Sequence, residues 1–300
     1  MKSNNRLAGH LACFMAYAIF GVNIITCKDL TQGQLISPFA LYTLRALGAG
    51  SLFWILSLFC PREKVEGRDY LKIFAAAFTG YFVTQLTFLV ALPEVTPMHC
   101  SILSAMSPIY TMFIAAVVLK EPLTWQKAGG VALSLCGIIF LILNNAGGSG
   151  TSESTLWGIF LMFLNSLSFS LYLGIFKPVI QKYSVVTFMK WIFLFSAVMG
   201  LPFSFREVFS LSWTQIPPVQ MWELAYLVVF ATFVSYFLIP FGQKIIRPTL
   251  VSIYSYVQPI IATVLSIIIG MDILTWQKVL AAVMVFGGVV IVSRSRSRVS

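Results

Sequence analysis

The sequence LTWQK occurs twice in this chain, at Leu123–Lys127 and at Leu274–Lys278. The second copy follows the first after 151 positions, and the same offset aligns further identical residues without a gap. The identical pairs outside LTWQK are Pro97 and Pro248, Ser101 and Ser252, Ser104 and Ser255, Pro108 and Pro259, and Gly137 and Gly288. A five-residue identity can arise by chance, but a register that also aligns prolines, serines and a glycine argues for duplication. We therefore interpret the chain as two homologous halves.

The composition excludes a water-soluble fold. Hydrophobic residues make up 58% of the 300 residues, charged residues only 10%, and the mean hydropathy is +0.88. Soluble domains have about 25% charged residues. Apolar runs close to the ~20 residues that a helix needs to cross a bilayer recur along the chain, and no alternating strand pattern of a membrane barrel is present. The sequence predicts an all-α polytopic membrane protein.

The apolar runs predict ten transmembrane helices, five in each half. Their expected positions are 7–27, 37–60, 69–91, 97–119, 124–143, 156–177, 185–205, 220–242, 248–270 and 275–293. The predicted units are a first repeat at 1–143, a linker at 144–155, a second repeat at 156–294 and a tail at 295–300.

The distribution of positive charge predicts the orientation. With a cytoplasmic N-terminus, most Lys and Arg fall in inside segments, and only Lys28, Arg206 and Lys278 fall outside. This pattern follows the positive-inside rule and places both termini in the cytoplasm and the linker outside. Because each half has an odd number of helices, the second half must be inverted relative to the first. Inverted repeats are typical of secondary transporters that work by alternating access.

The motif residues around LTWQK resemble those of a known family. Ser104, Ser107 and Pro108, followed by Glu121, LTWQK and Gly137, are similar to the later part of the repeat unit of the EamA family, in the drug/metabolite transporter superfamily. The second half matches through Ser255, Pro259, Asp272, Leu274–Lys278 and Gly288.

The resemblance covers nearly the whole chain. Arg45 looks like the arginine of that family's second helix, but it has no basic counterpart near Leu194, and Asp272 replaces the usual Glu. The resemblance implies ten helices in two inverted repeats, and export or exchange of small metabolites such as amino acids.

Matched serine–proline faces are the main candidate substrate site. Ser101, Ser104, Pro108 and Thr111 share one face of the fourth helix, and Ser252, Ser255, Pro259 and Thr263 repeat it on the ninth. Pro108 and Pro259 are predicted to kink their helices and free backbone carbonyls. The alternative is a packing face of small residues. Further candidate substrate contacts are Tyr17, Asn23, Tyr81, Gln85, His99, Asn165, Tyr172, Ser235, Tyr236 and Gln258.

These candidates are neutral amides, hydroxyls and aromatic rings, apart from one histidine. Such a lining suits a small amphipathic or aromatic solute better than a phosphorylated one, which needs clustered basic groups. For any single residue, packing between helices is the alternative reading.

Charged residues are scarce inside the predicted spans. Arg45 is expected to pair with carbonyls or face water, either locking the second helix or binding a substrate carboxylate. No carboxylate lies at mid-membrane, which favours a facilitator or exchanger over an ion-driven pump. Glu121 and Asp272 are expected to cap the helices that follow them. No ATP-binding motif is present.

The expected partners are a small-molecule substrate and the lipid bilayer, without nucleic acid, and the expected state is a monomer. We expect no cofactor, no metal site and no enzymatic activity. Short loops favour a bacterial inner membrane. The alternative functions are a non-transporting membrane scaffold and a membrane-embedded lipid enzyme.

Overall fold

Every regular element that the structure describes is a helix. The structure is a computed structural model that describes residues 2–32, 36–95, 100, 103–145, 154–211, 213, 216–268 and 275–295. The elements of the first half are α1 (Lys2–Gln32), α2 (Pro38–Leu58), α3 (Gly67–Ala77), the π-helix η1 (Phe78–Val83), α4 (Thr84–Ala91), α6 (Ser107–Val118) and α7 (Trp125–Asn145). Those of the second half are α8 (Leu156–Ile175), α9 (Lys177–Lys182), α10 (Val185–Phe209), α11 (Pro218–Tyr226), the π-helix η4 (Leu227–Val234), α12 (Ser235–Ile245), α13 (Pro248–Ile253), the 3₁₀ turn η5 (Tyr254–Tyr256), α14 (Val257–Ile268) and α15 (Trp276–Arg294).

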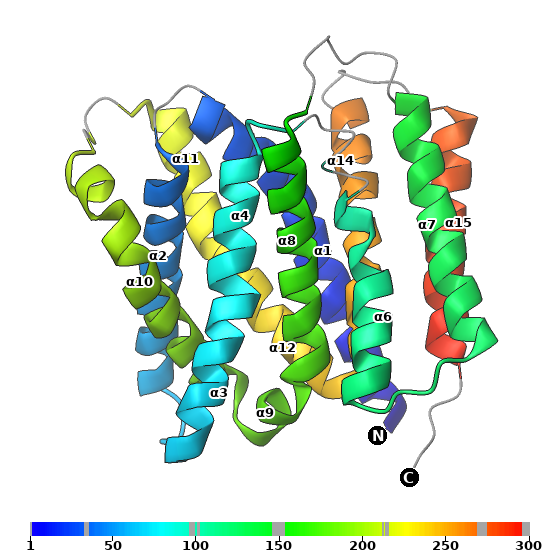
Figure 1. The fold of residues 1–300 in the computed structure, drawn as a ribbon, viewed down its shortest axis with the longest axis horizontal. Coiled ribbons are helices and arrows are strands. Elements are labelled where there is room, and N and C mark those ends of the chain that lie inside the picture. Colours follow the sequence, from blue (N-terminus) through cyan, green and yellow to red (C-terminus); the bar gives the residue numbers. More distant parts are fainter. Residues whose placement is uncertain are drawn as a thin grey trace.

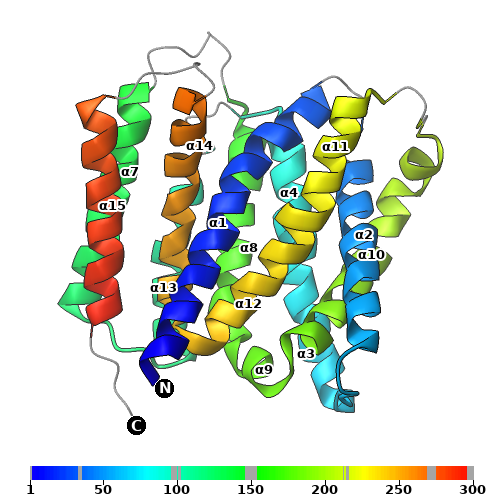
Figure 2. The same ribbon diagram turned by 180° about the vertical axis from the view of Figure 1, so that it is seen from behind.

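Equivalent helices of the two halves run in opposite directions. The helix α1 begins at the end of the bundle where α15 finishes, here called the terminal end (Figure 1). The helix α7 ends and α8 begins at the opposite end, here called the linker end (Figure 2). Accordingly α1 runs from the terminal to the linker end, and its equivalent α8 runs back.

The helices α7 and α15 pack against each other through glycines. A Cβ atom added to Gly137 would lie 3.0 Å from the Ala281 carbonyl oxygen, and one added to Gly130 would lie 2.8 Å from that of Gly288. Ala281 is the equivalent of Gly130, and Gly288 is the equivalent of Gly137, at the offset of 151 residues. Each contact is therefore the counterpart of the other, as in a two-fold symmetric interface.

Three hydrogen bonds join positions that are 151 residues apart. The Gln85 amide donates to Tyr236 Oη over 2.9 Å, the Tyr256 hydroxyl donates to the Ala105 carbonyl over 2.8 Å, and the Ser134 hydroxyl donates to the Val285 carbonyl over 3.1 Å. A two-fold operation carries each position onto its equivalent, so positions that touch their own equivalents lie at the axis. These bonds mark a pseudo-two-fold axis through the centre of the bundle.

Both halves carry a π-helical turn at the same place in the third predicted span. In the first half Thr84 Oγ1 donates to the Thr79 carbonyl over 2.6 Å, and in the second Ser235 Oγ donates to the Phe230 carbonyl over 3.0 Å. Both donors reach the carbonyl five residues earlier, and the two bonds are equivalent at the 151-residue offset. A side-chain hydroxyl thus satisfies a carbonyl in each widened turn.

The described helices support a membrane fold. Eight spans are long and apolar enough to cross a bilayer: Arg6–Thr31, Pro38–Leu58, Gly67–Ala91, Leu156–Ile175, Val185–Phe209, Pro218–Ile245, Pro248–Leu265 and Trp276–Arg294. Two shorter apolar helices are Leu103–Val118 and Trp125–Leu141. At about 1.5 Å per residue, Leu103–Val118 falls short of the roughly 30 Å hydrocarbon core. The count of ten transmembrane helices therefore stays a prediction.

Local features at three places differ from the expected helices. The fourth predicted helix breaks at Met106, so Pro108 is the second residue of α6, where a missing N–H costs little. The short helix α9 was not predicted. Glu121 does not cap α7: the Lys127 N–H donates to the Thr124 hydroxyl instead, over 3.1 Å. Asp272 lies outside the described residues.

Glu121 instead takes part in a buried ion pair. Lys127 Nζ lies 2.7 Å from Glu121 Oε2, and the side chains of Lys127 and Glu121 are 0% and 9% exposed. The same oxygen accepts a hydrogen bond from Thr249 Oγ1 over 3.0 Å. Since Thr249 belongs to the second half, this ion pair ties the two halves together at the terminal end.

Candidate functional site

A cavity of about 290 Å³ lies between the two halves, near the pseudo-two-fold axis. None of the residues that line it is charged. The lining consists of Tyr17, Phe20, Asn23, Ile24, Ile25, Thr84, Gln85, Phe88, Leu92, Val95, Cys100, Ser104, Ala105, Ser107, Asn165, Ser166, Phe169, Tyr236, Ser255, Tyr256, Gln258 and Pro259.

Each wall of the cavity follows the helical repeat of one element. On α1 the lining residues Tyr17, Phe20 and Ile24 are three and four residues apart. On α4 the lining residues Gln85 and Phe88 are three residues apart. Residues at this spacing share one helix face, so each helix presents polar and aromatic groups together to the cavity.

The π turns lie just before the two polar residues that meet at the axis. Gln85 and Tyr236 each stand two positions after the end of a π turn, since η1 ends at Val83 and η4 ends at Val234. A π turn inserts one extra residue, which rotates the side chains that follow it relative to those before it. The widened turns thereby set the direction of Gln85 and Tyr236, which line the cavity and hydrogen-bond to each other.

The broken fourth helix is held at the cavity wall by hydroxyls from the second half. Ser166 donates to the Leu103 carbonyl over 3.0 Å, and Ser170 donates to the Ser107 carbonyl, also over 3.0 Å. Asn165 Nδ2 donates to the Thr84 carbonyl over 2.6 Å. Carbonyls near the helix break and the π turn therefore find donors inside the protein, as non-helical backbone at membrane depth requires.

The cavity extends toward the linker end, because Leu92 and Val95, which follow the last residue of α4 there, belong to its lining. The terminal end is closed by contacts between the halves. His10 Nδ1 lies 2.8 Å from Tyr254 Oη, and a Cβ on Gly9 would lie 2.9 Å from Ile245 Cβ. Within the second half, Lys177 donates to the Ile246 carbonyl over 3.0 Å at the same end.

Eight of the predicted substrate contacts line the cavity: Tyr17, Asn23, Gln85, Ser104, Asn165, Tyr236, Ser255 and Gln258. Pro259 also lines it, but Pro108 does not. His99 and Ser101 lie outside the described residues. Contact with a ligand stays a prediction for all of them.

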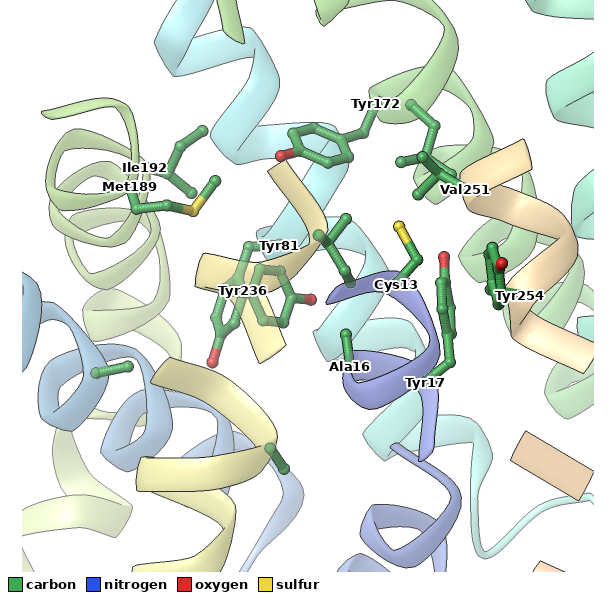
Figure 3. Close-up of a cluster of buried hydrophobic side chains, with 14 of the residues drawn as sticks. Cys13, Ala16, Tyr17, Tyr81, Tyr172, Met189, Ile192, Tyr236, Val251 and Tyr254 are labelled. Atoms are coloured by element: carbon green, nitrogen blue, oxygen red, sulfur yellow. The ribbon is translucent and has the colours of Figure 1, made fainter. Parts of the chain in front are cut away.

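Four other predicted contacts point elsewhere. Tyr81 packs against Tyr236 with ring centroids 5.1 Å apart, and Figure 3 shows the two rings side by side. The Tyr172 ring lies against Gly80. Ser235 donates to the Phe230 carbonyl, and Ser252 to the Thr249 carbonyl over 3.0 Å. The 3₁₀ turn η5 follows Ser252, which changes the helical phase and separates it from the face of Ser255.

Arg45 is fully buried and does not belong to the cavity lining. Its Nε donates to Thr232 Oγ1 over 2.9 Å and its Nη1 to Cys27 Sγ over 3.5 Å. The expectation that it pairs with carbonyls or faces water is therefore wrong: its described partners are a hydroxyl on η4 and a thiol on α1. Because α1, α2 and η4 meet at this side chain, its position supports the reading that it locks the second helix.

The cavity-lining residues that the sequence did not predict are mostly apolar. They include Phe20, Phe88 and Phe169, which lie three or four residues from Tyr17, Gln85 and Asn165. Helical spacing from the polar candidates was the signal that could have found them. Among the described residues, no group of His, Cys, Asp and Glu could hold a metal ion.

Replacing Tyr236 with Phe is expected to lower stability by about 1 kcal/mol, because Gln85 Nε2 loses its hydrogen-bond acceptor inside the protein. Thermal unfolding of the purified variant in detergent measures this. Ser293→Ala is the control, because Ser293 is part of α15 and its hydroxyl bonds only locally, to the Val290 carbonyl. An unchanged midpoint for Tyr236→Phe would show that the bond at the axis contributes nothing.

A duplicated helical bundle with apolar spans and an uncharged cavity at the junction of its halves defines a polytopic membrane protein with room for a small solute. The chain belongs to the EamA-like transporter family, whose model matches residues 7–143 and 156–294. This confirms the family resemblance and shows that the two halves are two EamA repeats. The protein is thus an integral membrane transporter.

Related proteins and a solved structure match nearly the full length of the chain. YetK, an uncharacterized transporter of Bacillus subtilis, is 23% identical over 95% of this chain and 86% of its own length. YcxC of the same organism, also an uncharacterized transporter, is 26% identical over 97% of this chain and 94% of its own. An uncharacterized transporter of Archaeoglobus fulgidus is 21% identical over 88% and 91%. One crystal structure superposes with a TM-score of 0.76 at 16% identity over 97% of this chain and 96% of that chain, which supports the fold.

Proposed function

We propose that this chain is a secondary transporter that exports or exchanges small organic metabolites such as amino acids, by alternating access between two inverted five-helix repeats. The observation that carries the proposal is the uncharged cavity built by both repeats at their pseudo-two-fold axis. A site at the repeat interface can be opened to either side by rocking one repeat against the other.

The lining supports the substrate class. Phe20, Phe88 and Phe169 offer apolar surface, while Gln85, Asn165 and Gln258 offer both donors and acceptors. A net-neutral solute with a polar head, such as a zwitterion, suits this mixture, because an unpaired charge in such a site would cost free energy. The absence of charge from the lining also fits a facilitator or exchanger.

The arrangement of the ends supports the proposed topology. The start of α1 and the end of α15 share the terminal end, which we assign to the cytoplasm of a bacterial inner membrane by the positive-inside rule. The cavity then reaches toward the outside, and the Glu121–Lys127–Thr249 cluster closes the inside. The state described would be outward-facing.

Flux into proteoliposomes tests the proposal. The purified protein is reconstituted and offered a panel of labelled amino acids and other small neutral metabolites, and we expect saturable uptake of at least one. Ser104→Leu places a bulky apolar group in the cavity and is expected to reduce that flux by about tenfold or more, since each 1.4 kcal/mol of lost binding is tenfold.

Ser51→Leu is the matched control, because Ser51 is exposed on α2 and its hydroxyl bonds only to the Leu47 carbonyl. It should transport like the wild type. Absence of saturable flux for every solute in the panel, or equal loss in both variants, would reject the cavity as a transport site and favour a non-transporting scaffold.

A further inference from the structure

A lysine at the terminal end sits in a cluster of aromatic rings on the outer surface of the bundle. Lys190 Nζ lies 5.0 Å from the centroid of the Trp54 ring. The rings of Trp54 and Trp191 pack edge-on with their centroids 5.5 Å apart, and the rings of Tyr70 and Trp191 pack edge-on with their centroids 4.9 Å apart. These four residues, from α2, α3 and α10, are here called the Lys190 cluster.

The nearby carboxylates are engaged by other groups. Asp69 is bound by Lys72, Lys182 and Tyr183, and Glu63 accepts a hydrogen bond from the Ser184 N–H over 2.9 Å. Among the described residues, no ion pair joins Lys190 to a carboxylate. The Lys190 charge thus has the Trp54 ring face beside it but no counter-charge from the described part of the chain.

The Lys190 cluster lies at one end of the membrane-spanning helices. Trp54 is near the end of α2, and Tyr70 and Lys190 are near the starts of α3 and α10, all at the terminal end of the bundle. Trp54 is 38% exposed, and the exposed side chains of Leu194 and Val198 continue along α10 away from the terminal end. Trp and Tyr concentrate at the membrane interface, and a Lys there extends its ammonium group toward the headgroups.

We propose that the Lys190 cluster binds the phosphate of an anionic phospholipid. The Lys190 ammonium pairs with the phosphate, the rings of Trp54, Tyr70 and Trp191 lie beside the glycerol region, and an acyl chain follows Leu194 and Val198 along α10. Anionic lipid at the cytoplasmic leaflet attracts basic residues near the surface. The proposal rests on the proposed cytoplasmic side of the terminal end, and it does not depend on which solute the protein transports.

Native mass spectrometry of the purified full-length protein tests this site. The protein in detergent is titrated with phosphatidylglycerol or with zwitterionic phosphatidylcholine. Wild type is expected to retain phosphatidylglycerol more strongly, and Lys190→Gln is expected to weaken that binding about fivefold. Lys190→Arg keeps the charge and should bind as the wild type does.

Lys64→Gln is the matched control, because Lys64 is exposed in the loop before α3 and carries the same charge. It should leave phosphatidylglycerol binding unchanged. Equal losses in Lys190→Gln and Lys64→Gln would show general attraction to a basic surface, and equal binding of the two lipids by the wild type would show no headgroup site. Either result overturns the proposal.

Discussion

Replacing Gly288 with Ala is expected to destabilise the protein by about 3 kcal/mol, because the added methyl group has no room. A Cβ at this position would overlap the Ser134 hydroxyl and the Gly130 carbonyl oxygen and would lie 3.0 Å from the Ser134 nitrogen. Two of these three atoms are backbone, so α7 and α15 would have to separate. Chemical or thermal unfolding of the purified variant in detergent measures the loss.

The neighbouring glycine provides the control. A Cβ at Gly287 would meet only Leu133 Cδ2, at 3.8 Å. Because Ala favours a helix interior over Gly by about 1 kcal/mol, Gly287→Ala should be neutral or stabilising. If the two substitutions lower stability equally, close packing between α7 and α15 does not hold the two repeats together.

Replacing Lys127 with Met is expected to cost about 3–5 kcal/mol, because the substitution leaves the Glu121 carboxylate buried without the cation that faces it. The expected result is a lower unfolding midpoint. The Lys127→Met substitution also weakens the contact between the repeats at the terminal end, because Glu121 Oε2 accepts a hydrogen bond from Thr249 of the second repeat as well.

The double variant Lys127→Met, Glu121→Gln should recover part of this loss by removing the unpaired charge. Lys72→Met is the control at an exposed ion pair, because the Lys72 side chain is 58% exposed and its Nζ lies 2.7 Å from Asp69. After this substitution the Asp69 carboxylate still has Lys182 as a partner. We expect it to cost less than about 1 kcal/mol. A Lys127→Met protein as stable as Lys72→Met would contradict a structural role for the buried pair.

Much of the fold could be predicted because its main determinant is the repeat register. The offset read from LTWQK also relates the starts of α7 and α15, at Trp125 and Trp276, and the hydrogen-bonded positions Gln85 and Tyr236. The π turns could not be predicted, because they depend on how hydroxyls such as Thr84 meet carbonyls within a packed bundle. Neither could the hydrogen bond that Glu121 accepts from Thr249, because Thr249 is distant from it in sequence.

The candidate site could be predicted in part, because its polar residues stand out in the sequence. Polar groups in apolar spans are rare, so Asn23, Gln85 and Asn165 stand out, and all three line the cavity. Phe88 and Phe169 do not stand out among the many apolar residues of a membrane protein. The placement of Ser252 depends on the 3₁₀ turn η5, which breaks the regular spacing that the prediction assumed.

The most direct test of the central claim is a structure of the protein determined with a transported solute bound. The account predicts density for the solute in the cavity between the two repeats, in contact with Gln85 or Tyr236 from the axis and with groups of both halves. A solute bound on the lipid-facing surface, with the central cavity empty, would contradict it.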